Sequence, residues 1–180
     1  MDGGLSLWTM PEPIPDLAPG VPELAPTIEK VKGEYILTCR SRMPRPRSEI
    51  FPFFADARNL QKLTPSNVQF KILTEGEIEM KEGALIDYRI KIRGIPIRWR
   101  TEITAWEPPD RFADVQLKGP YRQWIHEHVF VDEGPTTLVQ DRVRYKVLGG
   151  GLIHWLAVKR DVVKIFTYRD EMMAKLFPPL

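Results

Sequence analysis

The sequence predicts an α+β domain in which a curved antiparallel sheet of about seven strands wraps around one long C-terminal helix. Two observations predict it. Between residues 68 and 148, segments that alternate apolar and polar residues follow one another with only turns between them. Strands joined in this way pair antiparallel, because parallel pairing needs long crossover connections. Residues 152–177 contain neither proline nor glycine, and their apolar residues recur at helical spacing.

The elements can be justified in chain order. The first strand spans 34–43 and ends before Pro44. A short helix begins at Ser48, and a second one, at 57–63, stops before Pro65. The later strands are expected at 68–74, 84–93, 98–106, 111–118, 123–131 and 137–148. A sheet in this order can curl around the long helix in a helix-grip arrangement, with the two short helices closing one end.

Residues 1–33 have a different composition from the rest of the chain. Six prolines between positions 11 and 26 interrupt every periodic pattern and remove backbone donors. Such a segment favours extended, solvated conformations. We therefore predict a disordered proline-rich tail at 1–33 and a single folded domain at 34–180.

Composition excludes several classes of function. The 26 basic and 24 acidic residues nearly balance, so no overall positive charge favours nucleic acid. Cys39 is the only cysteine, which rules out a disulfide within the chain and a thiolate metal cluster. The first residues lack the basic and apolar regions of a signal peptide, and eighteen apolar residues never run together. These features predict a cytoplasmic protein without a transmembrane segment.

Four motifs lie on the predicted strands: Trp99-x-Thr101-x-Ile103, Phe112-x-Asp114-x-Gln116, Gly119-Pro120-Tyr121-x-x-Trp124-x-His126-x-His128-x-Phe130 and Asp141-x-Val143-x-Tyr145. With the order of elements, they resemble the SRPBCC superfamily, which includes START-like lipid-binding, polyketide cyclase and coenzyme-Q-binding proteins. The resemblance covers about residues 34–180. It implies a helix-grip fold with a ligand cavity, but it implies no particular activity, because this fold hosts carriers, receptors and cyclases.

The phase of three strands follows from their charged faces, which carry Arg89, Lys91 and Arg93; Arg98, Arg100 and Glu102; and Arg142, Arg144 and Lys146. The opposite faces must point inward. These inward residues are Ile86, Tyr88, Ile90, Trp99, Thr101, Ile103, Val139, Asp141, Val143 and Tyr145. Asp141 is the unusual one, because a buried carboxylate needs a hydrogen-bonding or cationic partner.

The phase of strands 111–118 and 123–131 stays open. One phase buries Phe112, Asp114, Gln116, Trp124, His126, His128 and Phe130; the other buries Ala113, Val115, Leu117, Ile125, Val129 and Val131. The resemblance implies the first phase, and so does the need of Asp141 for a partner. In that case the outer face of these strands carries an apolar patch beside the basic one and offers a candidate partner or homodimer surface. The basic face of strands 84–93 and 98–106 is a candidate docking site for an anionic membrane or a partner.

His126 and His128 are two residues apart and face the same side of their strand. We expect them to be buried histidines satisfied by Asp141, Asp114 and Gln116. The alternatives are a polar group that orients a ligand or exchanges a proton, and a metal site completed by Asp114 or Asp141. A His-x-His pair alone is a weak metal signal, so neither a metal nor another cofactor is expected.

The sequence favours a protein that binds a small hydrophobic ligand such as a lipid, an isoprenoid or a polyketide-like compound. The expected ligand-binding residues are Tyr88, Trp99, Thr101, Phe112, Asp114, Gln116, Trp124, His126, His128, Phe130, Asp141 and Tyr145. One alternative is a cofactor-free cyclase or dehydratase, with His126, His128 and Asp141 as candidate catalytic residues. Another is an interaction module that uses the basic and apolar outer face.

Overall fold

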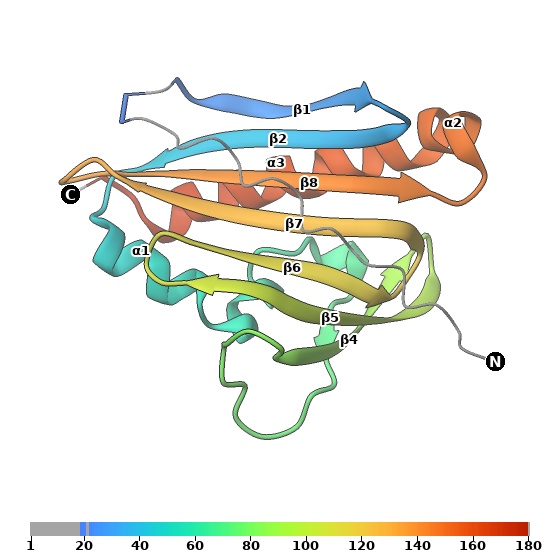
Figure 1. Cartoon of the computed structure of the whole chain (residues 1–180), viewed down its shortest axis with the longest axis horizontal. Helices are drawn as coiled ribbons and strands as arrows, with labels where there is room; N and C mark the ends of the chain where they lie inside the picture. Colours follow the sequence, from blue (N-terminus) through green and yellow to red (C-terminus); the bar gives the residue numbers. More distant parts are fainter. Residues whose placement is uncertain (1–18, 21, 180) are drawn as a thin grey trace.

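The computed structural model describes residues 19–20 and 22–179 as one eight-stranded antiparallel sheet that packs against a long C-terminal helix (Figure 1). The strand order is β1-β2-β8-β7-β6-β5-β4-β3, so β8, the last strand of the chain, lies between β2 and β7. The α+β helix-grip fold predicted from the sequence is therefore confirmed.

The strands agree closely with the alternating segments of the sequence. They are β1 (Leu24–Val31), β2 (Glu34–Met43), β3 (Lys71–Ile72), β4 (Leu85–Ile92), β5 (Ile95–Glu107), β6 (Arg111–Lys118), β7 (Tyr121–Asp132) and β8 (Thr137–Val147). The strand expected at 68–74 is reduced to the two residues of β3, since Gln69 adopts a left-handed conformation with φ 45° and breaks the extended chain.

Helical segments occupy the two regions where they were expected. Between β2 and β3 lie α1 (Arg47–Phe54) and the 3₁₀ turns η1 (Ala57–Gln61) and η2 (Ser66–Val68). After β8 the chain forms α2 (Gly150–Ile153), the π-helical segment η3 (His154–Val158) and α3 (Lys159–Leu176) without a break. No helix in the described part of the chain is both long enough and apolar enough to cross a membrane.

The prediction of a disordered tail at 1–33 is wrong for its last part. Residues 24–31 form β1, which pairs antiparallel with β2 along the edge of the sheet, from Leu24 opposite Arg40 to Val31 opposite Glu34. The prolines mislead here because an edge strand tolerates the loss of a backbone donor, and Pro26 lies at the irregularity in the β1–β2 register. Residues 1–18 and 21 lie outside the described residues.

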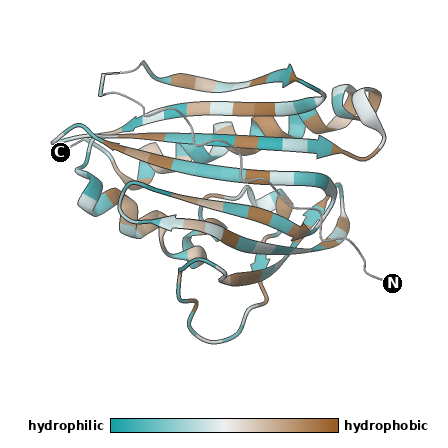
Figure 2. Ribbon diagram, in the orientation of Figure 1, coloured by the Kyte–Doolittle hydropathy of each residue, from teal (hydrophilic) through white to brown (hydrophobic). Residues whose placement is uncertain are grey.

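The inner face of the sheet and one stripe of α3 form the core. Along the strands, apolar and polar residues alternate (Figure 2), as a half-buried sheet requires. Val162 and Phe166 of α3 pack against Leu37, Val143 and Tyr145 of β2 and β8. Under α1, a second cluster contains Ile50, Phe51, Phe54, Phe112 and Phe130. The two clusters hold opposite ends of the sheet to the helices.

The apolar stripe of α3 does not continue through α2 and η3. Leu152, Trp155 and Leu156 fit the helical period of the sequence, but their side chains are 67%, 71% and 58% exposed. Trp155 and Leu156 lie within the π-helical segment η3, whose wider turn changes the helical phase relative to α3. His154 is buried in their place, where it accepts or donates a hydrogen bond with the Tyr145 hydroxyl at 2.8 Å.

Candidate functional site

A cavity of about 880 Å³ lies between the sheet and α3. Its wall comes from β4 to β7, from α3 and from the segment that contains α1, η1 and η2. Eight of the twelve predicted ligand-binding residues line it: Tyr88, Trp99, Thr101, Phe112, Asp114, Trp124, His126 and His128.

The remaining four, Gln116, Phe130, Asp141 and Tyr145, lie outside the cavity wall. The Gln116 amide folds back onto the β6–β7 turn, where it donates to the Tyr121 carbonyl oxygen at 2.8 Å. Phe130 is 1% exposed within the cluster under α1, and Tyr145 is fully buried against His154. Asp141 lies behind the two histidines. The inward phase of Asp141 and Tyr145 was predicted from the sequence and that of Gln116 and Phe130 was left open, and for all four the pattern did not give the depth within the core.

The register of β6 and β7 resolves the phase that the sequence left open. Asp114 pairs with His126 and Phe112 pairs with His128, so all four share the inner face. The turn between these strands is held by Gln116, whose side-chain oxygen would lie 2.2 Å from a Cβ atom at Gly119. Glycine at 119 therefore lets the amide occupy this turn and keep the register.

Two inner-face histidines converge on one carboxylate. His126 Nε2 lies 3.0 Å from Asp141 Oδ1, and His128 Nδ1 lies 2.6 Å from the same oxygen. On the other side of Asp141, Arg169 Nε of α3 lies 3.5 Å from Oδ2. The sequence predicted that Asp141 needs a hydrogen-bonding or cationic partner, and the structure supplies both: two imidazoles and one guanidinium.

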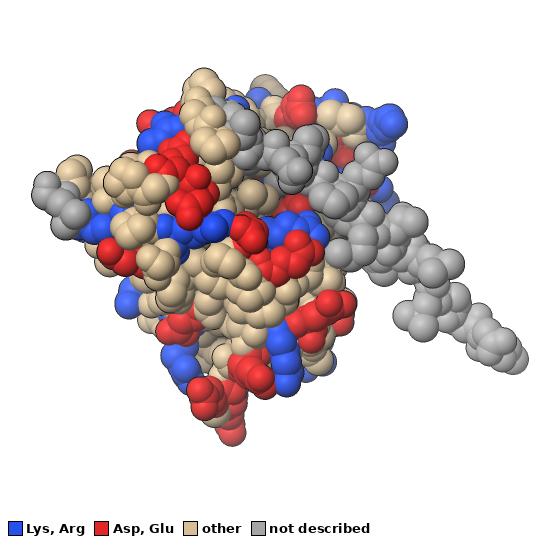
Figure 3. Space-filling model, turned by 60° about the vertical axis from the view of Figure 1, so that its left-hand side comes forward, with Lys and Arg blue, Asp and Glu red and all other residues tan. Residues whose placement is uncertain are grey.

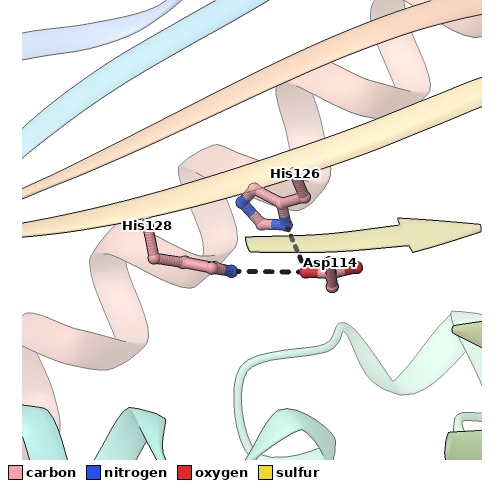
Figure 4. Close-up of side chains that lie close together, drawn as sticks. All are labelled: Asp114, His126 and His128. Atoms are coloured by element: carbon pink, nitrogen blue, oxygen red, sulfur yellow. Dashed lines mark ion pairs between the residues drawn. The ribbon is translucent and has the colours of Figure 1, made fainter. Parts of the chain in front are cut away.

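The other ring nitrogens of the histidines face Asp114 (Figure 4). His126 Nδ1 lies 3.8 Å and His128 Nε2 lies 3.7 Å from Asp114 Oδ2. These separations exceed those of a hydrogen bond. Asp114, His126 and His128 therefore surround a small space in the cavity wall. We call these three residues, together with Asp141 and Arg169, the polar cluster.

Burial controls the charges in the polar cluster. Burial by itself raises the pKa of Asp141, but the Arg169 guanidinium and the two histidines outweigh it and hold that pKa well below its usual value. Burial lowers the pKa of His126 to about 4, assisted by His128 and opposed by Asp141. At neutral pH, therefore, an ionised Asp141 faces Arg169 and a neutral His126.

Arg169 was not among the predicted site residues. It is 7% exposed and lies on the buried stripe of α3 with Val162, Phe166 and Met173. Its guanidinium carbon is 5.2 Å from the ring centre of Phe54 and 6.0 Å from that of Phe166. The signal was present in the sequence, since an arginine on the apolar stripe of a helix needs a buried anion.

Next to the polar cluster, four aromatic residues line the cavity: Tyr88, Trp99, Tyr121 and Trp124. We call them the aromatic wall. Their neighbouring rings have centres 4.6–5.7 Å apart. The Thr101 hydroxyl accepts a hydrogen bond from Trp99 Nε1 at 3.0 Å and lies 3.2 Å from the Tyr88 hydroxyl. Burial, and then the nearby Asp114, raises the pKa of Tyr88 well above its usual value, so its hydroxyl keeps its proton.

The basic outer face of β4 and β5 is partly neutralised. Arg100 forms an ion pair with Asp87 at 2.8 Å, and Arg93 forms one with Asp161 of α3 at 3.2 Å. Basic and acidic side chains are interspersed on the face drawn in Figure 3. Because acidic partners neutralise part of this basic face, its charge supports an interaction module less than the arginines in the sequence suggest. Dimer or membrane contact stays a prediction.

Comparisons with known proteins reveal a shared fold. No protein-family model matches the chain, and no curated protein matches it by sequence. Among solved structures, a START superfamily protein from Mycobacterium smegmatis is 13% identical with a TM-score of 0.59, covering 78% of this chain and 98% of the other. Major latex-like protein 151 from Panax ginseng is 17% identical with a TM-score of 0.60, covering 81% and 99%.

A third similar structure is the Zhui aromatase/cyclase from Streptomyces sp. R1128. It is 14% identical with a TM-score of 0.57, and the match covers 79% of this chain and 96% of that one. At such low identity, similarity of structure shows the fold and not the activity. The structural neighbours of this chain are START-like proteins of the SRPBCC superfamily, and the chain shares their helix-grip fold.

Proposed function

We propose that this protein binds a small hydrophobic molecule of the lipid, isoprenoid or polyketide-like class in the cavity between the sheet and α3. The observation that carries the proposal is the cavity itself. Its volume of about 880 Å³ lies within the ~300–1,000 Å³ typical of small-molecule sites. The fold adds support, because proteins with it typically bind hydrophobic ligands.

The wall matches such a ligand in chemistry as well as in size. Aromatic and aliphatic side chains form most of it, including the aromatic wall, Ile86, Ile90, Ile103 and Ile165. Asp114, His126 and His128 are the polar groups that converge at one place in this apolar surface. An apolar body with one oxygen function would satisfy both parts, because a few placed polar groups fix the orientation of a ligand that apolar contacts hold.

A second candidate function is acid–base catalysis on a polyketide-like compound. It is favoured by the way Asp141 holds both imidazoles, since a fixed imidazole with a free nitrogen toward the cavity can accept a proton from an enolisable ketone. The two functions differ in the effect of His126→Ala. In an enzyme the change removes turnover, whereas in a carrier it alters ligand preference and leaves binding in place.

Native mass spectrometry of freshly purified full-length protein tests the binding proposal. We expect an additional discrete mass that is absent from the denatured spectrum, and its fragments would identify the ligand class. The variant Ile165→Trp adds a large side chain to a cavity-lining position of α3 and should lose this mass. The control Glu171→Trp places the same side chain on the exposed face of α3 and should keep it.

The proposal fails if the wild-type protein carries no added mass and takes none up from a lipid extract. It also fails if Ile165→Trp retains the same adduct while circular dichroism shows a wild-type fold, because the molecule would then bind elsewhere.

A further inference from the structure

We infer that Asp114, His126 and His128 form a binding site for one divalent transition-metal ion in the wall of the cavity. Each residue offers one ligand atom, and these atoms lie within 4.8 Å of one another. The two imidazoles come from β7 and the carboxylate from the paired strand β6, so the sheet register itself brings the three together. The sequence alone made this set a weak candidate; three features of the structure strengthen it.

The first feature is the direction of the ring nitrogens. His126 Nε2 lies 3.0 Å from Asp141 Oδ1, a hydrogen-bond distance, and because an ionised carboxylate can only accept, this nitrogen carries the proton. A neutral imidazole with a proton on one nitrogen has a lone pair on the other. His126 Nδ1, which faces Asp114, is therefore the unprotonated nitrogen. His128 Nδ1 lies 2.6 Å from Asp141 Oδ1 and 3.4 Å from Arg169 Nη2, and its Nε2 faces Asp114.

This arrangement is the one that metal-binding histidines show. A ligating histidine usually donates its second N–H to a carboxylate or carbonyl group, which orients the ring and makes the ligating nitrogen more basic. Here Asp141 is this partner for His126 and also contacts His128, and Arg169 in turn contacts Asp141 Oδ2 at 3.5 Å. Asp141 and Arg169 would act as positioning residues and not as ligands.

The second feature is the spacing between the ligand atoms. The distances of 3.8 and 3.7 Å between the histidine nitrogens and Asp114 Oδ2 are too long for hydrogen bonds. Tetrahedral metal ligands bonded at about 2.1 Å lie about 3.4 Å apart. A small inward movement of the three side chains would therefore give metal-ligand geometry.

The third feature is that Asp114 is a buried acceptor without a hydrogen-bond donor among the described residues. The Asp114 side chain receives no hydrogen bond from any residue that the structure describes, and the unprotonated His126 Nδ1 faces it, with His128 Nε2 beside it. The three side chains are only 16%, 8% and 5% exposed. Converging acceptors in such a buried place are unfavourable unless a cation lies between them. Arg169 lies 3.5 Å from Asp141 Oδ2 and 3.4 Å from His128 Nδ1, and among the described residues no ion pair joins it to Asp114.

Two imidazoles and one carboxylate suit Zn²⁺ and Fe²⁺, and three protein ligands leave at least one position open. All three residues line the cavity, so the open position faces it. The oxygen function of a hydrophobic ligand in the cavity would occupy this open position. This part of the inference rests on the proposed function. Metal binding itself does not depend on that ligand.

Calorimetric titration of tag-free, metal-stripped and delipidated full-length protein with ZnCl₂ tests the site. We expect one ion per chain with micromolar or tighter affinity. Co²⁺ should give visible absorption bands typical of a four- or five-coordinate ion. Asp114→Asn keeps the shape of the side chain and should weaken Zn²⁺ binding by about 100-fold or more, and His126→Gln should do the same.

Asp161→Asn is the matched control. Asp161 also lines the cavity, but it pairs with Arg93 away from the polar cluster, and the change should leave Zn²⁺ affinity unaltered. The inference is overturned if neither ion binds stoichiometrically. It is equally overturned if folded Asp114→Asn and His126→Gln bind Zn²⁺ as tightly as the wild-type protein. Since the titration contains no hydrophobic ligand, its failure would leave the native mass spectrum, and thus the proposed function, unaffected.

Discussion

The polar cluster and the aromatic wall are neighbours on the inner side of the sheet and share strand β7, but they are built in different ways. The aromatic wall is held by contacts between neighbouring rings and by one shared hydroxyl, that of Thr101. In the polar cluster, Asp141 contacts both histidines and Arg169, so these four residues depend on one another's charge or proton position. The difference predicts that substitutions in the wall have small effects, whereas substitutions in the cluster have large ones.

The largest effect is expected when the buried cation is removed. Arg169→Met keeps most of the side-chain volume but leaves the ionised Asp141 without its compensating charge. Removing one partner of a buried ion pair typically costs about 3–5 kcal/mol. We expect a loss of this size in the free energy of unfolding, measured by urea denaturation.

Arg160→Met is the control for this change, because Arg160 is exposed on the same helix. An exposed substitution of this kind should alter the free energy of unfolding by no more than about 0.5 kcal/mol. Equal, small losses in both variants would show that the polar cluster does not depend on Arg169.

An intermediate effect is expected at Asp170, next to the polar cluster. Burial, opposed by the hydrogen bond from the Ser41 hydroxyl at 2.8 Å and assisted by Asp141, raises the pKa of Asp170 to about 6. Because the folded-state pKa lies above the unfolded value of 3.8, this group contributes stability below about pH 4 that is lost as the pH rises through 6.

Asp170→Asn removes that pH dependence. The free energy of unfolding of the variant, relative to wild type, should therefore increase by about 2 kcal/mol between pH 4 and pH 7, a value reduced for the partial exposure of the carboxyl group. Urea denaturation at several pH values measures it, with exposed Glu171→Gln as the control. If the difference in the free energy of unfolding between wild type and variant stays constant with pH, the pKa of Asp170 is not raised. The charge of Asp141 then does not affect residues outside the polar cluster.

The smallest effect is expected in the aromatic wall. Thr101→Val keeps the shape of the side chain but removes the acceptor of the Trp99 indole N–H and the partner of the Tyr88 hydroxyl. We expect a loss of about 1 kcal/mol in the free energy of unfolding, together with a shift in tryptophan fluorescence.

Thr104→Val makes the same change three residues along β5. Among the described residues, the buried Thr104 hydroxyl has no hydrogen-bond partner, so its removal should be neutral or slightly stabilising. If Thr101→Val costs as much as Arg169→Met, the wall is as interdependent as the polar cluster, and the distinction between the two regions is wrong.

Much of the site could be predicted from the sequence, because strand alternation is a local property. The charged faces of β4, β5 and β8 correctly place Tyr88, Trp99, Thr101 and Asp141 on the inner face. Alternation does not give depth. It cannot distinguish Trp124, which lines the cavity, from Phe130, which α1 covers completely.

Two features needed contacts between distant segments. Residues 24–31 become a strand only because the free edge of β2 is available to pair with them, and edge pairing depends on the rest of the sheet. Arg169 meets His128 across 41 positions of the chain, with 3.4 Å between Arg169 Nη2 and His128 Nδ1. Neither contact can be predicted from the local pattern of residues.

The sequence by itself determined the antiparallel strands, the long C-terminal helix, the inner faces of three strands and the need of Asp141 for a partner. Those properties follow from backbone periodicity and from the cost of burying a charge, which apply to each segment alone. The tertiary structure alone decided the phase of β6 and β7, the edge strand, the identity of Arg169 and the convergence of Asp114 with the two histidines. These depend on packing and desolvation, which exist only once distant segments meet.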